Sequence, residues 1–70
     1  MMEPRYYLVV IELLDSDGNV DRIDGMTVIG DLERAQKFRE MAYKHYDDRG
    51  FSVCIKIYSD QDILKAFRRI

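Results

Sequence analysis

The sequence of 70 residues contains one cysteine, one histidine, one proline and no tryptophan. The single cysteine, Cys54, excludes a disulfide within the chain. One histidine, His45, beside one cysteine argues against a zinc site built from these ligands. Disulfides and metals are the usual supports of a domain this small. We therefore expect its stability to come from tight packing or from association with another chain.

An excess of positive charge and a long apolar run are also missing. The formal net charge is -2 at pH 7, so no overall basic field directs the chain to nucleic acid. No apolar run is long enough to cross a membrane, and the N-terminus does not resemble a signal peptide. The composition, 47% hydrophobic and 34% charged, is that of a globular protein. We expect a single domain over 1–70, cytoplasmic, without membrane association or a cofactor.

Charge is divided unevenly along the chain. Residues 1–31 contain seven acidic and two basic residues, whereas residues 32–70 contain six acidic and nine basic residues. Such asymmetry indicates an interaction surface. A nucleic-acid-associated regulatory protein that uses the basic half is therefore an alternative function. Acidic residues interrupt the basic ones, however, and this favours a solvated face of mixed charge over a nucleic-acid site.

The most apolar stretch, Tyr6–Leu14, is rich in β-branched and aromatic residues and ends in a turn. This predicts a strand, and apolar residues on both of its faces predict that it is the central one. Asp17–Asn19 predicts a three-residue hairpin loop that pairs Leu13 with Ile23. A two-residue loop would instead pair Leu13 with Arg22.

The returning strand is expected over about 20–29, with an interruption at Asp24 and Gly25. We interpret this pair as a β-bulge, because a bulge changes which side chains face the core. In that register Met26 and Val28 turn inward.

Two amphipathic helices follow. Apolar residues at helical spacing predict a helix over 32–47 that begins after the N-cap Asp31 and ends before Gly50. Residues 51–58 alternate and predict a half-buried strand. Ser59 and Asp62 then form a capping box that opens a second helix. Its apolar stripe consists of Ile63, Leu64, Phe67 and Ile70.

The order β-β-α-β-α predicts an α+β two-layer sandwich. We expect a three-stranded sheet with strand order 2-1-3, because the first strand is apolar on both faces. Both helices are expected to cover one face of the sheet. That face is formed by Val9, Ile11, Val53, Ile55 and Ile57.

The opposite face carries an apolar centre with a polar or aromatic rim, which is the composition of a protein interface. We predict that this face binds a protein partner or a second copy of the chain. The candidate partner-binding residues are Tyr6, Leu8, Val10, Cys54, Lys56 and Tyr58.

No catalytic or metal constellation is present in the sequence, so we expect a non-enzymatic protein. Calcium loops of the EF-hand type need Gly at the sixth position and Glu at the twelfth, and the acidic stretch from Asp15 has neither. Its Asp, Gly and Asn residues are typical of turns. His45 and Cys54 lack visible catalytic partners.

The segment Met26–Ile57 contains a strand, a helix that begins Asp-Leu-Glu-x-Ala, and an Arg-Gly-Phe-x-Val strand. This order resembles small phage-encoded accessory proteins such as the small inhibitors of bacterial RNA polymerase. The resemblance covers under half of the chain, and the first hairpin arm and the second helix depart from it. It implies a small, acidic, non-enzymatic binder of phage or mobile-element origin, and no residue role is carried over.

Overall fold

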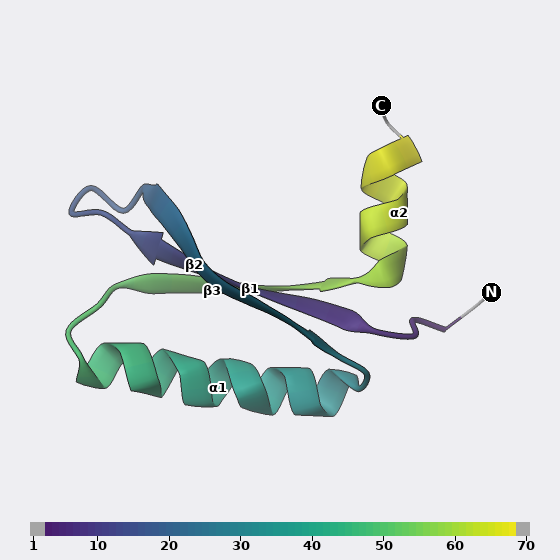
Figure 1. Cartoon of the computed structure of the whole chain (residues 1–70), viewed down its shortest axis with the longest axis horizontal. Coiled ribbons are helices and arrows are strands. Elements are labelled where there is room, and N and C mark those ends of the chain that lie inside the picture. Colours follow the sequence, from purple (N-terminus) through teal and green to yellow (C-terminus); the bar gives the residue numbers. More distant parts are fainter. Residues whose placement is uncertain (1–2, 69–70) are drawn as a thin grey trace.

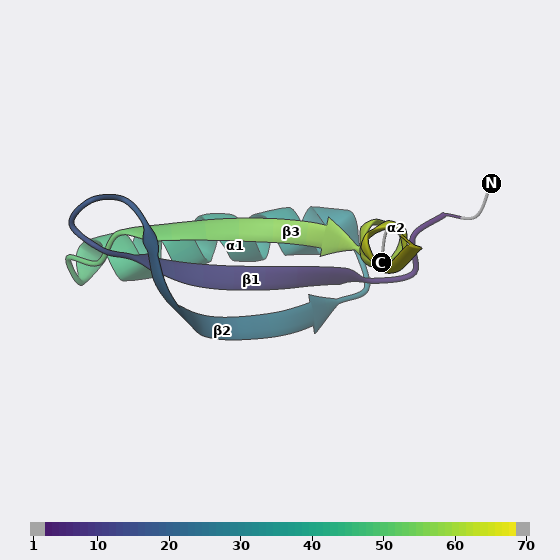
Figure 2. The ribbon, with the colours of Figure 1, turned by 90° about the horizontal axis from the view of Figure 1, so that it is seen from above.

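The computed structural model describes residues 3–68, which form three strands and two helices. In chain order they are β1 (Tyr7–Leu14), β2 (Val20–Ile29), α1 (Leu32–Asp48), β3 (Val53–Ser59) and α2 (Asp60–Arg68). The strands form one antiparallel sheet in the order β2-β1-β3 (Figure 2). The α+β class, the strand order and the central position of β1 are therefore as predicted.

The core lies between α1 and one face of the sheet (Figure 1). Val9 on β1 and Ala35 on α1 are fully buried there. Alanines at the contact let the helix approach the sheet closely, and larger side chains close the layer on both sides. The buried cluster consists of Val9, Ile11, Ala35, Ala42 and Ile55, and the partly buried residues around it are Tyr7, Ile29, Phe38, Tyr46, Val53 and Ile57.

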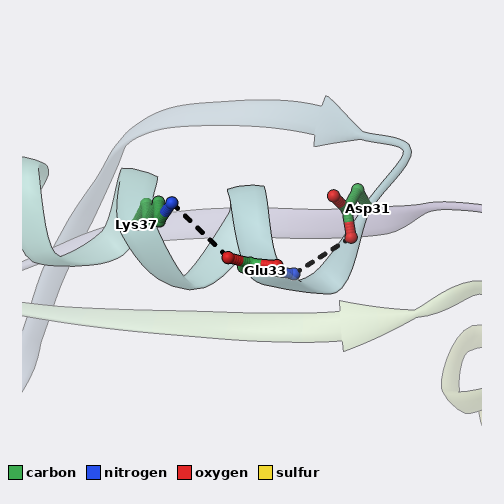
Figure 3. A network of polar contacts seen from close by, with 3 residues as sticks. All are labelled: Asp31, Glu33 and Lys37. Atoms are coloured by element: carbon green, nitrogen blue, oxygen red, sulfur yellow. Dashed lines mark hydrogen bonds and ion pairs between the residues drawn. The ribbon is translucent and has the colours of Figure 1, made fainter.

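Local sequence signals set both ends of α1. Asp31 is the N-cap, and its carboxylate accepts a hydrogen bond of 3.2 Å from the Glu33 amide (Figure 3). One turn on, the Glu33 carboxylate pairs with Lys37 at 3.5 Å. At the other end Gly50 has φ 79°, and the Phe51 amide donates to the Tyr46 carbonyl. This is a Schellman motif, which the predicted glycine makes possible.

The placement of α2 differs from the prediction. We expected both helices on one face, but α2 stands at the end of the sheet on the side away from α1 (Figure 1). No loop separates β3 from α2, so the helix begins directly at the end of the strand. The buried Asp60 fixes its start, because its carboxylate accepts from the Arg5 amide and its own amide donates to the Tyr6 carbonyl. Ile70 lies outside the described residues.

The hairpin register also differs from the prediction. The Asp15 amide donates to the Asn19 carbonyl at 2.8 Å, so the loop is Ser16–Gly18, one residue earlier than expected. Gly18 takes φ 82° there, and the Asp15 carboxylate accepts hydrogen bonds from the Asp17 and Asn19 amides. This loop together with the extra residue Asp21 in β2 pairs Leu13 with Arg22, and the predicted pairing with Ile23 is wrong.

β2 contains two register shifts where one was predicted. The shift at Asp24 is confirmed, and a second shift leaves Asp21 without a partner on β1. Each extra residue in a strand reverses which side chains face the core. The effects of Asp21 and Asp24 therefore cancel, and the residues after Asp24 face the same way as in a strand without a bulge. Met26 therefore pairs with Val10 and Val28 pairs with Leu8, both on the face away from α1. The prediction that Met26 and Val28 turn inward is wrong.

Candidate functional site

The sheet face away from α1, called here the outer face, gathers most of the predicted partner-binding residues. Cross-strand pairing places Leu8 beside Tyr58 and Val10 beside Lys56, while Cys54 lies opposite Glu12. These pairs point to the same side, because directly paired residues of antiparallel strands share a face. The outer face therefore contains five of the six predicted residues, which are Leu8, Val10, Cys54, Lys56 and Tyr58.

Tyr6, the sixth predicted residue, lies before β1 and beside the start of α2. Its carbonyl accepts the Asp60 amide at 3.1 Å, and its side chain lines a shallow depression together with Ile63 and Leu64 of α2. Tyr6 is 40% exposed. It therefore borders α2 at the end of the sheet, outside β1 itself.

Sequence reasoning missed the contribution of β2 to the outer face. Ile23, Met26 and Val28 are 54%, 63% and 62% exposed, and they pair with Glu12, Val10 and Leu8 of β1. These are the most exposed apolar side chains of the sheet, and they extend the predicted face across its full width. A signal was present in the small residues Gly25 and Thr27, which alternate with them and leave little apolar surface to turn inward.

Val10 occupies the centre of the outer face and is only 7% exposed. It does not belong to the core cluster beneath α1, and its neighbours on the two flanking strands are Met26 and Lys56. These longer side chains account for its burial. A charge at Val10 would disturb the packing of the sheet, so Met26 and Val28 are better positions at which to probe the face.

One ion pair crosses the outer face beside Val10. The Glu12 carboxylate lies 3.3 Å from Lys56 Nζ, and the Glu12 side chain is 14% exposed against 46% for Lys56. The close contact with the Glu12 carboxylate and the attraction between the two charges raise the pKa of Lys56. The pair places polar groups toward the β3 side of the face.

α2 adds an apolar wall at one end of the outer face. An open groove of 650 Å³ lies beside the helix, and Tyr58 of β3 lines it together with residues of α2. The helix residues that line the groove include Ile63, Ala66 and Phe67, and Phe67 is 67% exposed. A capping box holds the helix start: the Asp62 amide donates to Ser59 Oγ at 3.1 Å and the Ser59 amide donates to the Asp62 carboxylate at 2.9 Å.

Within the described residues, the remaining candidates for catalysis or metal binding lie in separate places. His45 lies near the end of α1, where its ring nitrogen and its carbonyl each lie 3.0 Å from the Arg49 guanidinium. Cys54 is a half-buried free thiol on the other side of the sheet from α1. Residues 3–68 contain no group of three or more His, Cys, Asp and Glu side chains placed to hold a metal ion.

Comparisons with protein-family models, with curated proteins and with solved structures find no match to this chain. No helix within residues 3–68 has the length and apolar character needed to cross a membrane.

Proposed function

We propose that this chain is a non-enzymatic, cytoplasmic protein-interaction module that binds protein through its outer face. The observation that carries the proposal is the row of exposed apolar side chains along β2, formed by Ile23, Met26 and Val28. Monomeric proteins rarely leave contiguous apolar patches open to water, and such patches usually mark protein interfaces. The aromatic ring of Tyr58 and the Glu12–Lys56 ion pair supply the polar and aromatic rim that interfaces favour.

The proposal includes an accessory role in a phage or a mobile element. Its support is the resemblance of Met26–Ile57 to small phage-encoded binders, together with the small size and acidic charge of the chain. A binder of this kind works by covering a surface, so it needs an exposed apolar face more than it needs a catalytic group.

The test compares two substitutions that each place one charge on an exposed methionine. Met26→Asp lies on the outer face, and Met41→Asp lies on α1, where Met41 is 71% exposed. Tagged wild type and both variants are examined by sedimentation velocity and by retention of proteins from a bacterial lysate, with circular dichroism as the check on folding. We expect Met26→Asp to lose self-association or partner retention, and Met41→Asp to keep it.

Two results would count against the proposal. One is a wild-type chain that neither self-associates nor retains any protein. The other is binding to nucleic acid that weakens steeply with added salt, because release of counterions has that signature and burial of an apolar face does not. That second result would support the alternative function, a nucleic-acid-associated regulator.

A further inference from the structure

The proposed function leaves the occupant of the outer face open, and we infer that it is a second copy of this chain. The two copies pack outer face against outer face, and α2 of each copy lies against the β1–β2 hairpin of the other. This inference rests on the proposed function, because it uses the same face and specifies what covers it. Its support comes from surface area, shape and charge.

The chain exposes more surface than a compact monomer of its size. A folded monomer of 8.3 kDa is expected to expose about 4,600 Å². This chain exposes 5656 Å², an excess of roughly 1,000 Å² over that reference. A stable protein interface of standard size hides about 800 Å² on each partner. One interface per chain would therefore bring the exposed surface close to that of an ordinary folded protein.

The outer face has the shape of a trough. α2 stands at one end of the sheet, and the tip of the β1–β2 hairpin rises at the other end on the same side (Figure 1). A helix of nine residues, the length of α2, is about 13 Å tall. Two sheets that stack face to face are about 10 Å apart. α2 is therefore tall enough to reach the level of a second sheet and to flank its end.

Two chains can stack outer face to outer face in two ways, and the charges at the ends of the sheet favour one of them. The last turn of α2 carries Lys65 and Arg68, whereas the hairpin end carries Asp15, Asp17 and Asp21. One two-fold arrangement brings α2 against α2 and hairpin against hairpin, so like charges meet. The other brings α2 of each copy to the hairpin of the second copy, so opposite charges meet twice. Because like charges across an interface are unfavourable, the second arrangement is selected.

The same arrangement pairs the remaining exposed apolar groups. Val20 and Ile23 lie on β2 near the hairpin and are 51% and 54% exposed, and Phe67 on α2 is 67% exposed. Within one chain the β1–β2 hairpin and α2 stand at opposite ends of the sheet (Figure 1). In the two-fold pair, Val20 and Ile23 of one copy enter the groove beside Phe67 of the other. The groove is thereby filled by a second copy of the same sequence.

Charge reversal tests the inference. One variant carries Lys65→Glu and Arg68→Glu, a second carries Asp17→Lys and Asp21→Lys, and a third carries all four changes. Sedimentation equilibrium of the purified chains gives the dimer dissociation constant of each. We expect the wild type to dimerise, each double variant to dimerise roughly tenfold more weakly or worse, and the fourfold variant to recover. All changes lie on exposed positions, and circular dichroism verifies folding.

The outcomes separate this inference from the proposed function. A wild type that stays monomeric while it retains a lysate protein, with retention lost in Met26→Asp, overturns the second copy as occupant and leaves the proposed function standing. A dimer that is unaffected by Met26→Asp overturns both. A dimer lost in Met26→Asp but indifferent to every charge reversal overturns the arrangement of α2 against the hairpin.

Discussion

Tyr46 and Asp24 make a contact that holds α1 to the bulged strand β2. The Tyr46 hydroxyl donates a hydrogen bond to the Asp24 carboxylate. This hydrogen bond, followed by burial and by the negative charge of Asp24, raises the pKa of Tyr46 above its ordinary value of 10.0. Folding therefore favours the protonated hydroxyl, and the bulge residue that shifts the register of β2 is also anchored to the helix.

The raised pKa predicts a loss of stability at alkaline pH. The unfolded chain gives up the Tyr46 proton at a lower pH than the folded chain, so stability from this contact is complete below about pH 10 and declines as pH rises through the folded pKa. Urea unfolding of Tyr46→Phe should show a lower free energy of unfolding at neutral pH and a shallower alkaline decline than the wild type. Tyr6→Phe, outside this contact, should follow the wild-type curve. Parallel curves for wild type and Tyr46→Phe would contradict the prediction.

Among the elements, the β1–β2 hairpin decides which residues the outer face displays. Gly18 sits in the left-handed region at φ 82°, a conformation that a β-branched residue adopts only at a cost. Gly18→Val should lower the free energy of unfolding by about 1 to 2 kcal/mol, although no atom lies within 4 Å of a Cβ added there. Thermal unfolding measures this.

The matched control for Gly18→Val is Gly30→Ala. Gly30 also has open space around an added Cβ and does not take a positive φ. Its melting temperature should stay close to that of the wild type. Equal melting temperatures for wild type and Gly18→Val would show that the turn conformation does not constrain the hairpin.

The existence of each element could be predicted from the sequence, because each carries its own local signals. Asp31 and Gly50 bound α1, and Ser59 with Asp62 opens α2. The register of β2 was predicted wrongly, because one bulge and two bulges leave opposite faces buried and nothing local to Asp21 marks the second. The small residues Gly25 and Thr27 were the signal that the prediction overlooked. This is why five of the candidate residues, all on β1 and β3, share the outer face as expected, whereas Met26 and Val28 were assigned to the core.

The position of α2 could not be predicted for a different reason. Its direction depends on Asp60, whose carboxylate accepts a hydrogen bond from the Arg5 amide, 55 residues away along the chain. A contact of that span leaves no periodic pattern near either residue. The apolar stripe of α2 was identified, but the surface that it faces follows only from the three-dimensional arrangement.

At the scale of the whole molecule, a helix covers one face of the sheet and the other face is exposed. α1 closes the first face over Val9 and Ile11, whereas the second is bordered only at its two ends, by α2 and by the tip of the β1–β2 hairpin. The radius of gyration is 13.4 Å, against about 11 Å expected for a compact chain of this length. The proposed function and the inferred dimer both follow from this asymmetry, since a second molecule on the open face would complete the fold.

The most direct test of the outer face as an interface is to detect contacts between chains in solution. A sample that mixes isotope-labelled and unlabelled chains gives nuclear Overhauser effects that arise only between molecules. We predict intermolecular contacts from the methyl groups of Met26 and Val28, and contacts between Phe67 of one copy and Ile23 of the other. Intermolecular contacts that arise from Met41 on α1 instead, with none from Met26 or Val28, would contradict the claim that the outer face is the interface.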